Sequence, residues 1–313
     1  MAALFILGLA LLLAGAEGLV RSASRMAKMF GVSPLLIGLT VVAFGTSTPE
    51  LFVSCYGAYS GKAGISLGNI IGSNIFNILF ILGFSALITP LTVRKQLVFL
   101  DVPVMVAASV VLWLFSYAGT LTWGEGVFFL TGMGIYTHWL LQIRQKEKHA
   151  APKIPYSKEQ AYTQSFIAVA SLALLLLGAT LFVKGAEEIA RFFGISDLII
   201  GLTVVAIGTS LPELATSIVA AYRKEQDIAI GNILGSNIFN VLFITGLSLF
   251  FAPEGVSVPA NALTYDLPIM ILVSAICFPI LYTKYKITRI EGLFLLLSYG
   301  GYLYFTFSYP PAA

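Results

Sequence analysis

Long apolar stretches, each of about the length that crosses a membrane, follow one another along nearly the whole chain. A spanning helix requires about 20 mostly apolar residues, and ten stretches meet this requirement. They lie near 2–20, 34–59, 65–89, 97–117, 122–142, 163–183, 197–222, 227–251, 264–282 and 290–308. The pattern therefore predicts an all-α polytopic membrane protein with ten transmembrane helices, in which 143–162 is the extended polar linker.

The sequence also repeats itself with an offset of 163 residues. Gly31–Gly83 aligns without a gap on Gly194–Gly246, with 33 of 53 positions identical. The segment GLTVVAFGTSTPELFVS returns as GLTVVAIGTSLPELATS, and GNIIGSNIFN returns as GNILGSNIFN. Each half then holds five helices, and an odd number predicts that the two repeats cross the membrane in opposite senses, as in many secondary transporters. We expect two inverted five-helix repeats, 1–142 with its core at 38–83 and 163–313 with its core at 201–246.

The composition excludes the soluble classes of protein. Hydrophobic residues make up 58% of the chain and charged residues 11%, with a mean hydropathy of +0.91, whereas a soluble domain carries about 25% charge. A soluble enzyme, a nucleic-acid binder and a disordered chain are therefore excluded. No Walker-type phosphate loop is found, which argues against an ATP-driven pump. Cys55 and Cys277 lie in apolar runs, and we predict that both are small buried residues rather than disulfide or metal partners.

The placement of the basic residues predicts the orientation. Of 18 Lys and Arg residues, 15 lie in loops that join an odd to an even helix, and Lys62, Lys184 and Arg191 lie elsewhere. Because basic loops face the cytoplasm, we expect both termini outside and the 143–162 linker in the cytoplasm, in the cell (inner) membrane. Lipid is the expected environment. No nucleic acid and no obligate protein partner are predicted.

Two glutamates lie in mid-span, within the repeated Gly-Thr-Ser-x-Pro-Glu segment. Glu50 and Glu213 are candidate functional groups because an ionisable side chain is costly inside a membrane. Pro49 and Pro212 lack an N–H, so a carbonyl one turn earlier loses its helical partner. Further oxygen-bearing side chains share these helices and the next ones: Thr46, Ser47, Asn69, Ser73, Asn77, Thr209, Ser210, Asn232, Ser236 and Asn240, with Asn74 and Asn237 beside them.

An all-oxygen set favours hard cations over zinc or copper. Two carboxylates are neutralised by one Ca²⁺, by two Na⁺ or by two protons, which permits exchange of one divalent for monovalent ions. Several of these residues could have a structural role instead. The Asn and Ser stripes could form interhelical hydrogen bonds. The glycine pairs Gly68/Gly72 and Gly231/Gly235 are typical of close helix packing. Asp101 and Asp266 lie near helix starts, where a carboxylate favours the helix dipole, and we predict that they are helix caps.

The paired G-T-S-x-P-E and G-N-x-x-G-S-N motifs resemble those of the sodium/calcium exchanger family, within the cation/calcium antiporter superfamily. The resemblance covers nearly the whole chain, and the lack of a large cytoplasmic loop is typical of prokaryotic members. It implies a secondary-active antiporter, not an enzyme, that exchanges Ca²⁺ for Na⁺ by alternating access. The ions would bind at the midplane between the repeats, with no cofactor beyond the transported Ca²⁺ and Na⁺.

The resemblance also implies a role for each matching residue. Glu50 and Glu213 would be the central Ca²⁺ ligands, with the backbone oxygens of Thr46 and Thr209. Na⁺ sites would be lined by Ala43, Ser47 and Ser73 on one side, and by Ala206, Ser210 and Ser236 on the other. Asn77 and Asn240 would occupy the middle. Many exchangers have Asp at one middle position; here both are Asn, which removes a titratable group and argues against the potassium-dependent branch. Helices 1 and 6 would slide against a core of helices 2, 3, 7 and 8, and exchange of three Na⁺ for one Ca²⁺ would be electrogenic.

Rival hypotheses remain at this point. The same scaffold could exchange Ca²⁺ for protons, because two protons balance the two carboxylates equally well. A passive cation channel and a non-transporting membrane scaffold or receptor belong to other classes. Oxygen ligands also suit Mn²⁺ and Mg²⁺.

Overall fold

The computed structural model describes residues 2–147, 155–193 and 206–308. The chain forms two compact units, a first unit of Met1–Pro49 with Leu140–Asn232 and a second unit of Glu50–Trp139 with Ile233–Ala313. Each unit combines segments from both halves of the sequence. The two units are described separately below.

The described elements are almost entirely helical. Those of the first half are α1 (Ala2–Phe30), α2 (Pro34–Ile37), η1 (Gly38–Val42), α3 (Ala43–Thr46), α4 (Thr48–Tyr59), α5 (Ala63–Phe76), η2 (Asn77–Leu82), α6 (Gly83–Ile88), β1 (Leu91–Thr92), η3 (Leu97–Asp101), α7 (Val102–Ser116), β2 (Thr120–Leu121) and α8 (Trp123–Glu147). Those of the second half are α9 (Lys158–Phe192), α11 (Ala206–Gly208), α12 (Leu211–Tyr222), α13 (Gln226–Phe239), η5 (Asn240–Ile244), α14 (Thr245–Phe250), β3 (Val256–Ser257), η6 (Ala262–Asp266), α15 (Leu267–Tyr282), η7 (Thr283–Tyr285), β4 (Lys286–Ile287) and α16 (Arg289–Ser308). The segments η1, η2, η3, η5 and η6 are π-helical, and η7 is a 3₁₀ turn.

The helices coincide with the apolar stretches of the sequence. Six are long and apolar enough to cross a membrane: Ala2–Phe30, Ala63–Ile88, Leu97–Ser116, Lys158–Phe192, Gln226–Phe250 and Ala262–Tyr285. The broken pair Pro34–Thr46 and Thr48–Tyr59 brings the number to seven if it is one span. Helices α8 and α16 match the predicted stretches 122–142 and 290–308, and the start of the predicted stretch 197–222 lies outside the described residues. These findings confirm a helical chain with several membrane spans.

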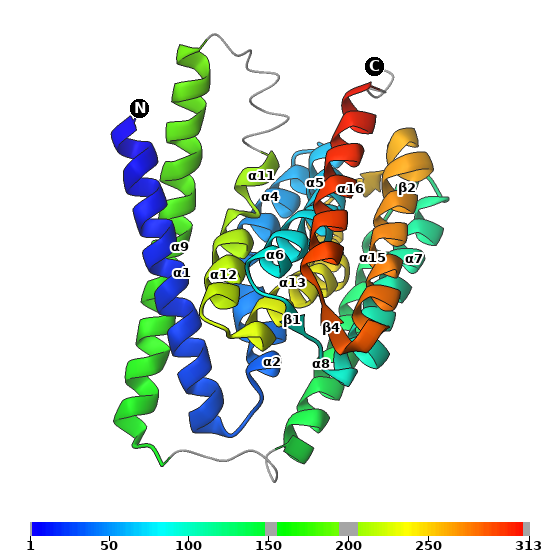
Figure 1. Cartoon of the computed structure of the whole chain (residues 1–313). Helices are drawn as coiled ribbons and strands as arrows, with labels where there is room; N and C mark the ends of the chain where they lie inside the picture. The colour runs from blue at the N-terminus through cyan, green and yellow to red at the C-terminus, as the bar shows by residue number, and fades with distance from the viewer. Residues whose placement is uncertain (1, 148–154, 194–205, 309–313) are drawn as a thin grey trace. The chain divides into compact units, whose positions relative to one another are not determined.

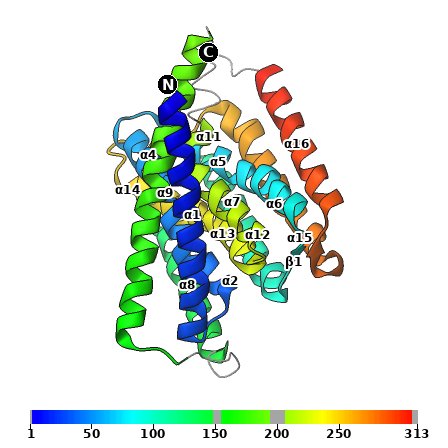
Figure 2. The same ribbon diagram turned by 60° about the vertical axis from the view of Figure 1, so that its left-hand side comes forward.

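In the first unit, α1 and α9 lie side by side along their length (Figures 1 and 2). Glycines permit this close approach. A Cβ atom on Gly178 would lie 2.3 Å from the backbone nitrogen of Leu12, and one on Gly15 would lie 2.5 Å from that of Leu175. No side chain fits such a gap, so small residues let these two apolar helices pack backbone against backbone.

A second close approach joins the start of α13 to the α2–η1 segment, also in the first unit. A Cβ atom on Gly231 would lie 2.8 Å from the carbonyl oxygen of Leu35, and one on Gly38 would lie 3.0 Å from that of Ile228. The packing role predicted for Gly231 is thereby confirmed. A Cβ atom on Gly68 or on Gly72 would have no described atom of another segment within 4 Å, so the close packing predicted for this pair is not seen among the described residues.

In the second unit, contacts occur in matching pairs. Strand β1 pairs antiparallel with β4 (Leu91 opposite Ile287), and β2 pairs antiparallel with β3 (Leu121 opposite Val256). Gly83 of α6 packs against Gly292 of α16, as Gly246 of α14 packs against Gly126 of α8. The two strand pairs are equivalent under the sequence repeat, because a shift of about 165 residues relates β1 to β3 and β2 to β4. The two glycine contacts are equivalent in the same way. The segments of the two sequence repeats therefore contact each other reciprocally within this unit.

Candidate ion-binding site

Both copies of the repeated motif break a helix just before the glutamate. Helix α3 ends and α4 begins around Ser47 (φ −80°, ψ 10°), and α12 begins after Ser210 (φ −87°, ψ 8°). Pro49 and Pro212 are each the second residue of the new helix, a position where the missing N–H costs nothing. Each glutamate follows directly, in the first turn. The breaks predicted from the two prolines are confirmed.

In the first unit, Glu213 is 0% exposed and holds a short hydrogen bond. The Ser47 hydroxyl donates to Glu213 Oε1 over 2.8 Å, across 166 residues of sequence. Next to Ser47, the Thr46 hydroxyl donates to Asn232 Oδ1 over 3.0 Å. The motif of the first repeat thus contacts the glutamate and the following helix of the second repeat.

Asn232 also fixes the backbone of the same glutamate. Its Nδ2 donates to the main-chain carbonyl of Glu213 over 3.4 Å and to the Ser217 hydroxyl over 3.0 Å. Asn232 is itself 0% exposed. The start of α12 is therefore tied to α13 by one amide group.

In the second unit, Glu50 is 1% exposed. Its Oε1 accepts a hydrogen bond from the Ser73 hydroxyl at 3.5 Å, the outer limit for such a bond. Asn69 Nδ2 donates to the Glu50 carbonyl over 3.1 Å and to the Ser54 hydroxyl over 2.8 Å. The start of α4 is tied to α5 in the same way as α12 is tied to α13.

The two predicted middle residues lie at the starts of matching π-helical segments. Asn77 begins η2 and Asn240 begins η5, and π-helical turns are frequent at functional sites. Asn77 Nδ2 donates to Asn237 Oδ1 over 2.9 Å, and Asn240 Nδ2 donates to Asn74 Oδ1 over 3.1 Å. All four of these asparagines are at most 1% exposed. They form one buried amide network in the second unit.

The remaining predicted residues lie on the same elements. Ala43 begins α3 and is fully buried, and its carbonyl accepts from the Ser47 N–H over 3.0 Å and from the Thr46 hydroxyl over 3.3 Å. Ser210 and Ser236 are buried, and Thr209 is partly buried. Ala206 begins α11, and its side chain lies outside the described atoms. Across the described ranges, no three His, Cys, Asp or Glu side chains are grouped to hold a metal ion.

The sequence interpretation left the roles of four asparagines undecided. Asn69 and Asn232 hold the glutamate backbones, while Asn74 and Asn237 hold the middle asparagines. The four-residue spacing of the Asn and Ser residues indicated that they share one helix face. It could not indicate their hydrogen-bond partners, because those partners lie on other helices.

Asp101 and Asp266, which we predicted to be helix caps, each directly precede an α-helix, α7 and α15. Neither side chain makes a capping hydrogen bond, and the backbone is already helical there (φ −70°, ψ −44° at both). Asp101 is fully buried and instead accepts from the Tyr136 hydroxyl over 2.8 Å and from Gln96 Nε2 over 3.3 Å. It links η3 to α8 within the second unit.

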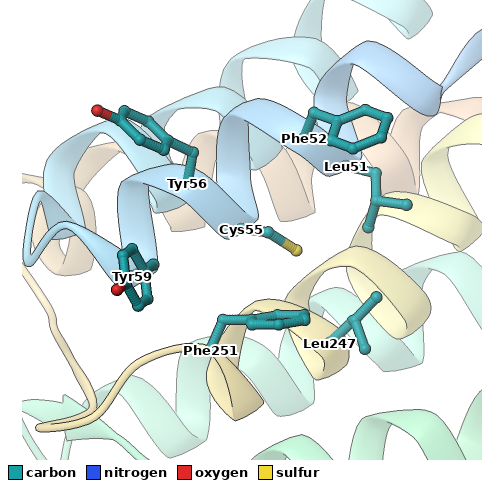
Figure 3. A pocket seen from close by; sticks show the side chains of 7 residues that line it. All are labelled: Leu51, Phe52, Cys55, Tyr56, Tyr59, Leu247 and Phe251. Atoms are coloured by element: carbon teal, nitrogen blue, oxygen red, sulfur yellow. The ribbon is translucent and has the colours of Figure 1, made fainter.

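A groove of about 380 Å³ lies beside α4 in the second unit (Figure 3). Its lining is almost wholly apolar: Leu51, Phe52, Cys55, Tyr56, Tyr59, Leu247 and Phe251. Cys277 is buried as predicted, but Cys55 is only partly buried, and its thiol lies 3.6 Å from the Ser248 hydroxyl. Such a lining has no ligand set for a cation, so the groove is distinct from the glutamate clusters.

Comparison with known proteins identifies the family of the chain. A family model described as sodium/calcium exchanger protein matches residues 1–142 and 164–308. The chain belongs to the sodium/calcium exchanger family. It is similar to the putative antiporter CaxA of Alkalimonas amylolytica (38% identity over 98% of this chain and 99% of CaxA). It is also similar to the inner membrane protein YrbG of Escherichia coli strain K12 (38% identity over 96% of this chain and 94% of YrbG).

Solved structures of the sodium-calcium exchanger NCX_Mj share the fold. One, soaked with 10 mM Na⁺ and 10 mM Sr²⁺, superposes with a TM-score of 0.84 at 33% identity and covers 99% of this chain and 98% of that one. Membership of the exchanger family makes this chain a multi-pass membrane transporter rather than an enzyme.

Proposed function

We propose that this exchanger carries Ca²⁺ in one direction and Na⁺ in the other by alternating access. Glu50 and Glu213 would share the Ca²⁺ ion with the backbone oxygens of Thr46 and Thr209. The serines of the two motifs, with Ala43 and Ala206, would line Na⁺ sites, and Asn77 and Asn240 would form the middle. The observation that carries the proposal is the burial of both motif glutamates, each with a serine hydroxyl on its carboxylate.

The physical reason is the cost of these carboxylates. A carboxylate buried in a membrane protein costs several kcal/mol unless a charge or a set of donors compensates it. A serine hydroxyl can rotate, so that it either donates to the carboxylate or turns its oxygen toward a cation. Exchange of Ca²⁺ for Na⁺ leaves such a site compensated at every stage.

Two further features support inverted repeats and alternating access. The reciprocal pairs β1–β4 and β3–β2, with the Gly83–Gly292 and Gly246–Gly126 contacts, are the pattern that a pseudo-two-fold axis between repeats produces. The close α1–α9 packing supports the proposal that helices 1 and 6 move together as one body. We expect ten spans, with both termini outside and the 143–162 linker in the cytoplasm, in the cell membrane.

The test is ⁴⁵Ca²⁺ uptake into proteoliposomes that are loaded with Na⁺ and diluted into Na⁺-free buffer. Uptake should require the outward Na⁺ gradient and should disappear in Glu50→Gln and in Glu213→Gln. Glu254→Gln, at an exposed glutamate of the second unit, is the matched control and should transport normally.

Other outcomes assign other functions. Uptake driven by an outward proton gradient without Na⁺ would make the chain a Ca²⁺/H⁺ antiporter. Flux without any counter-gradient would indicate a passive channel. No Ca²⁺ flux from folded protein would contradict the proposal and lead to the same assay with Mn²⁺ and Mg²⁺.

A further inference from the structure

The amide network of the second unit contains a feature that the ion ligands alone do not explain. The Nδ2 atoms of Asn77 and Asn240 each donate to another asparagine. The Oδ1 atom of each is buried and accepts no hydrogen bond from any described residue. A buried amide oxygen without a donor is unfavourable, because it has lost its hydrogen bonds to water without gaining others. Two such oxygens at equivalent positions of the repeats indicate acceptors held ready for a cation or its water.

The orientation of the Asn77 and Asn240 amides is determined by their hydrogen-bond partners, Asn237 and Asn74. An amide can present either its oxygen or its NH₂ group, and the choice depends on its neighbours. Asn237 Oδ1 can only accept, so it requires the NH₂ of Asn77; Asn74 Oδ1 likewise requires the NH₂ of Asn240. The opposite end of each middle amide must then carry its oxygen.

The two orienting asparagines are in turn held by each other. Asn237 Nδ2 donates to the Asn74 carbonyl over 3.1 Å, and Asn74 Nδ2 lies 3.5 Å from the Asn237 carbonyl and 3.7 Å from Met270 Sδ. With their NH₂ groups engaged on backbone, their Oδ1 atoms are left for the middle pair. The network is crossed, since each asparagine holds the middle residue of the other repeat.

We infer that Asn74 and Asn237 are positioning residues, which turn the side-chain oxygens of Asn240 and Asn77 toward the transported cations. This inference rests on the proposed function for the identity of those cations. It predicts a specific effect on Na⁺, because the proposed Ca²⁺ ligands are carboxylates and backbone oxygens instead.

The test compares two substitutions at each position. Asn237→Leu removes the acceptor, whereas Asn237→Asp keeps an acceptor oxygen for Asn77; Asn74→Leu and Asn74→Asp form the second pair. We expect the Leu variants to raise the half-saturating Na⁺ concentration about tenfold, or about 1.4 kcal/mol. The maximal rate and the half-saturating Ca²⁺ concentration should stay within about twofold. The Asp variants should recover most of the loss. Asn261→Leu, at a partly buried asparagine before η6, is the control and should behave as the parent.

A double-mutant cycle tests the crossed pairing. If Asn237 acts through Asn77, then Asn237→Leu should add nothing to Asn77→Ala, but its effect should multiply with that of Asn240→Ala. Equal effects of Leu and Asp would overturn the inference. Parallel losses of Na⁺ affinity, Ca²⁺ affinity and melting temperature in the Leu variants would also overturn it. The same holds if the effect of Asn237→Leu multiplies both with that of Asn77→Ala and with that of Asn240→Ala.

Failure of the proposed function is distinguishable from failure of this inference. If the parent protein shows no Na⁺-driven Ca²⁺ uptake, the proposed function fails. The same cycle is then read from the rise in melting temperature that Na⁺ or Ca²⁺ produces in purified protein, which requires no transport. Linked effects of Asn237 with Asn77 there would still support the positioning role, and additive effects would contradict it.

Discussion

The two repeated motifs have the same local framework around their glutamates. Asn69 donates to the Glu50 carbonyl over 3.1 Å and to Ser54 over 2.8 Å, and Asn232 donates to the Glu213 carbonyl over 3.4 Å and to Ser217 over 3.0 Å. Each carboxylate also accepts from a serine hydroxyl. Ser47 of the other repeat donates to Glu213 at 2.8 Å, and Ser73 of the same repeat donates to Glu50 at 3.5 Å.

The framework bonds and the contact between Ser47 and Glu213 carry two kinds of structural information. The framework bonds join a helix to the next one along the chain, and identical sequence produces identical bonds there. The contact between Ser47 and Glu213 instead depends on where distant segments meet.

The largest expected effect tests whether the two carboxylates are equivalent in function. Glu50→Gln and Glu213→Gln should each reduce Na⁺-dependent Ca²⁺ uptake at least about 100-fold, or about 2.8 kcal/mol, because a neutral amide cannot replace a charged ligand. Uptake into proteoliposomes measures the loss. Near-normal uptake in either variant would show that only one repeat supplies a central ligand.

The next effect concerns the common framework. Asn69→Leu and Asn232→Leu each remove the amide that donates to a glutamate carbonyl and to a serine hydroxyl, and Asn232→Leu also removes the acceptor of the Thr46 hydroxyl. The loss of a hydrogen-bond partner costs a buried polar group about 1–3 kcal/mol. We expect Ca²⁺ uptake to fall about 10- to 30-fold in both variants, and by the same factor within about threefold. The melting temperature of purified protein should fall in both. A severe loss in one variant beside a normal partner would break the equivalence of the two frameworks.

The sequence predicted the helices and their breaks well, because these depend on local sequence. The apolar stretches located the helices to within a few residues, apart from longer ends such as those of α1 and α9. The chemistry of Pro49 and Pro212 marked both helix breaks. The offset of the repeat also indicated that equivalent residues would have equivalent neighbours, as the β1–β4 and β3–β2 pairs do.

Contacts between distant segments could not be predicted in this way. Asp101 has the position of a cap, but its carboxylate accepts from Tyr136, a partner supplied by α8. Cys55 lies in an apolar run, yet it is only partly buried and lines a groove together with residues of α14, a helix distant in the sequence. The contact between Ser47 and Glu213 joins residues 166 positions apart. Which hydroxyl reaches which carboxylate is decided by packing.

The serine substitutions test that packing directly. A hydrogen bond to a charged group contributes about 1.5–3 kcal/mol, and its strength falls steeply at the limiting distance. Ser47→Ala should therefore lower kcat/KM for Ca²⁺ about tenfold, and Ser73→Ala only about twofold. Ser298→Ala, whose hydroxyl bonds to its own helix, should have no effect. The reverse ranking of Ser47 and Ser73 would show that the short bond is absent in the transporting state.

The smallest expected effect concerns the two serines that accept from the framework amides, Ser54 from Asn69 and Ser217 from Asn232. Ser54→Ala and Ser217→Ala each remove the hydroxyl that accepts from the amide, over 2.8 Å and 3.0 Å, while the amide keeps its bond to the glutamate carbonyl. The Ser54 hydroxyl also donates to the Ser66 carbonyl, but at 3.4 Å, near the limit for a hydrogen bond. A neutral bond contributes about 0.5–1.5 kcal/mol net, so we expect uptake to fall about twofold in both repeats. In the background of Asn69→Leu, Ser54→Ala should have little further effect, because the amide donor is already gone. An additional loss in that double variant would mean that Ser54 acts on the glutamate by a route other than Asn69, and the shared framework would no longer account for the likeness of the two repeats.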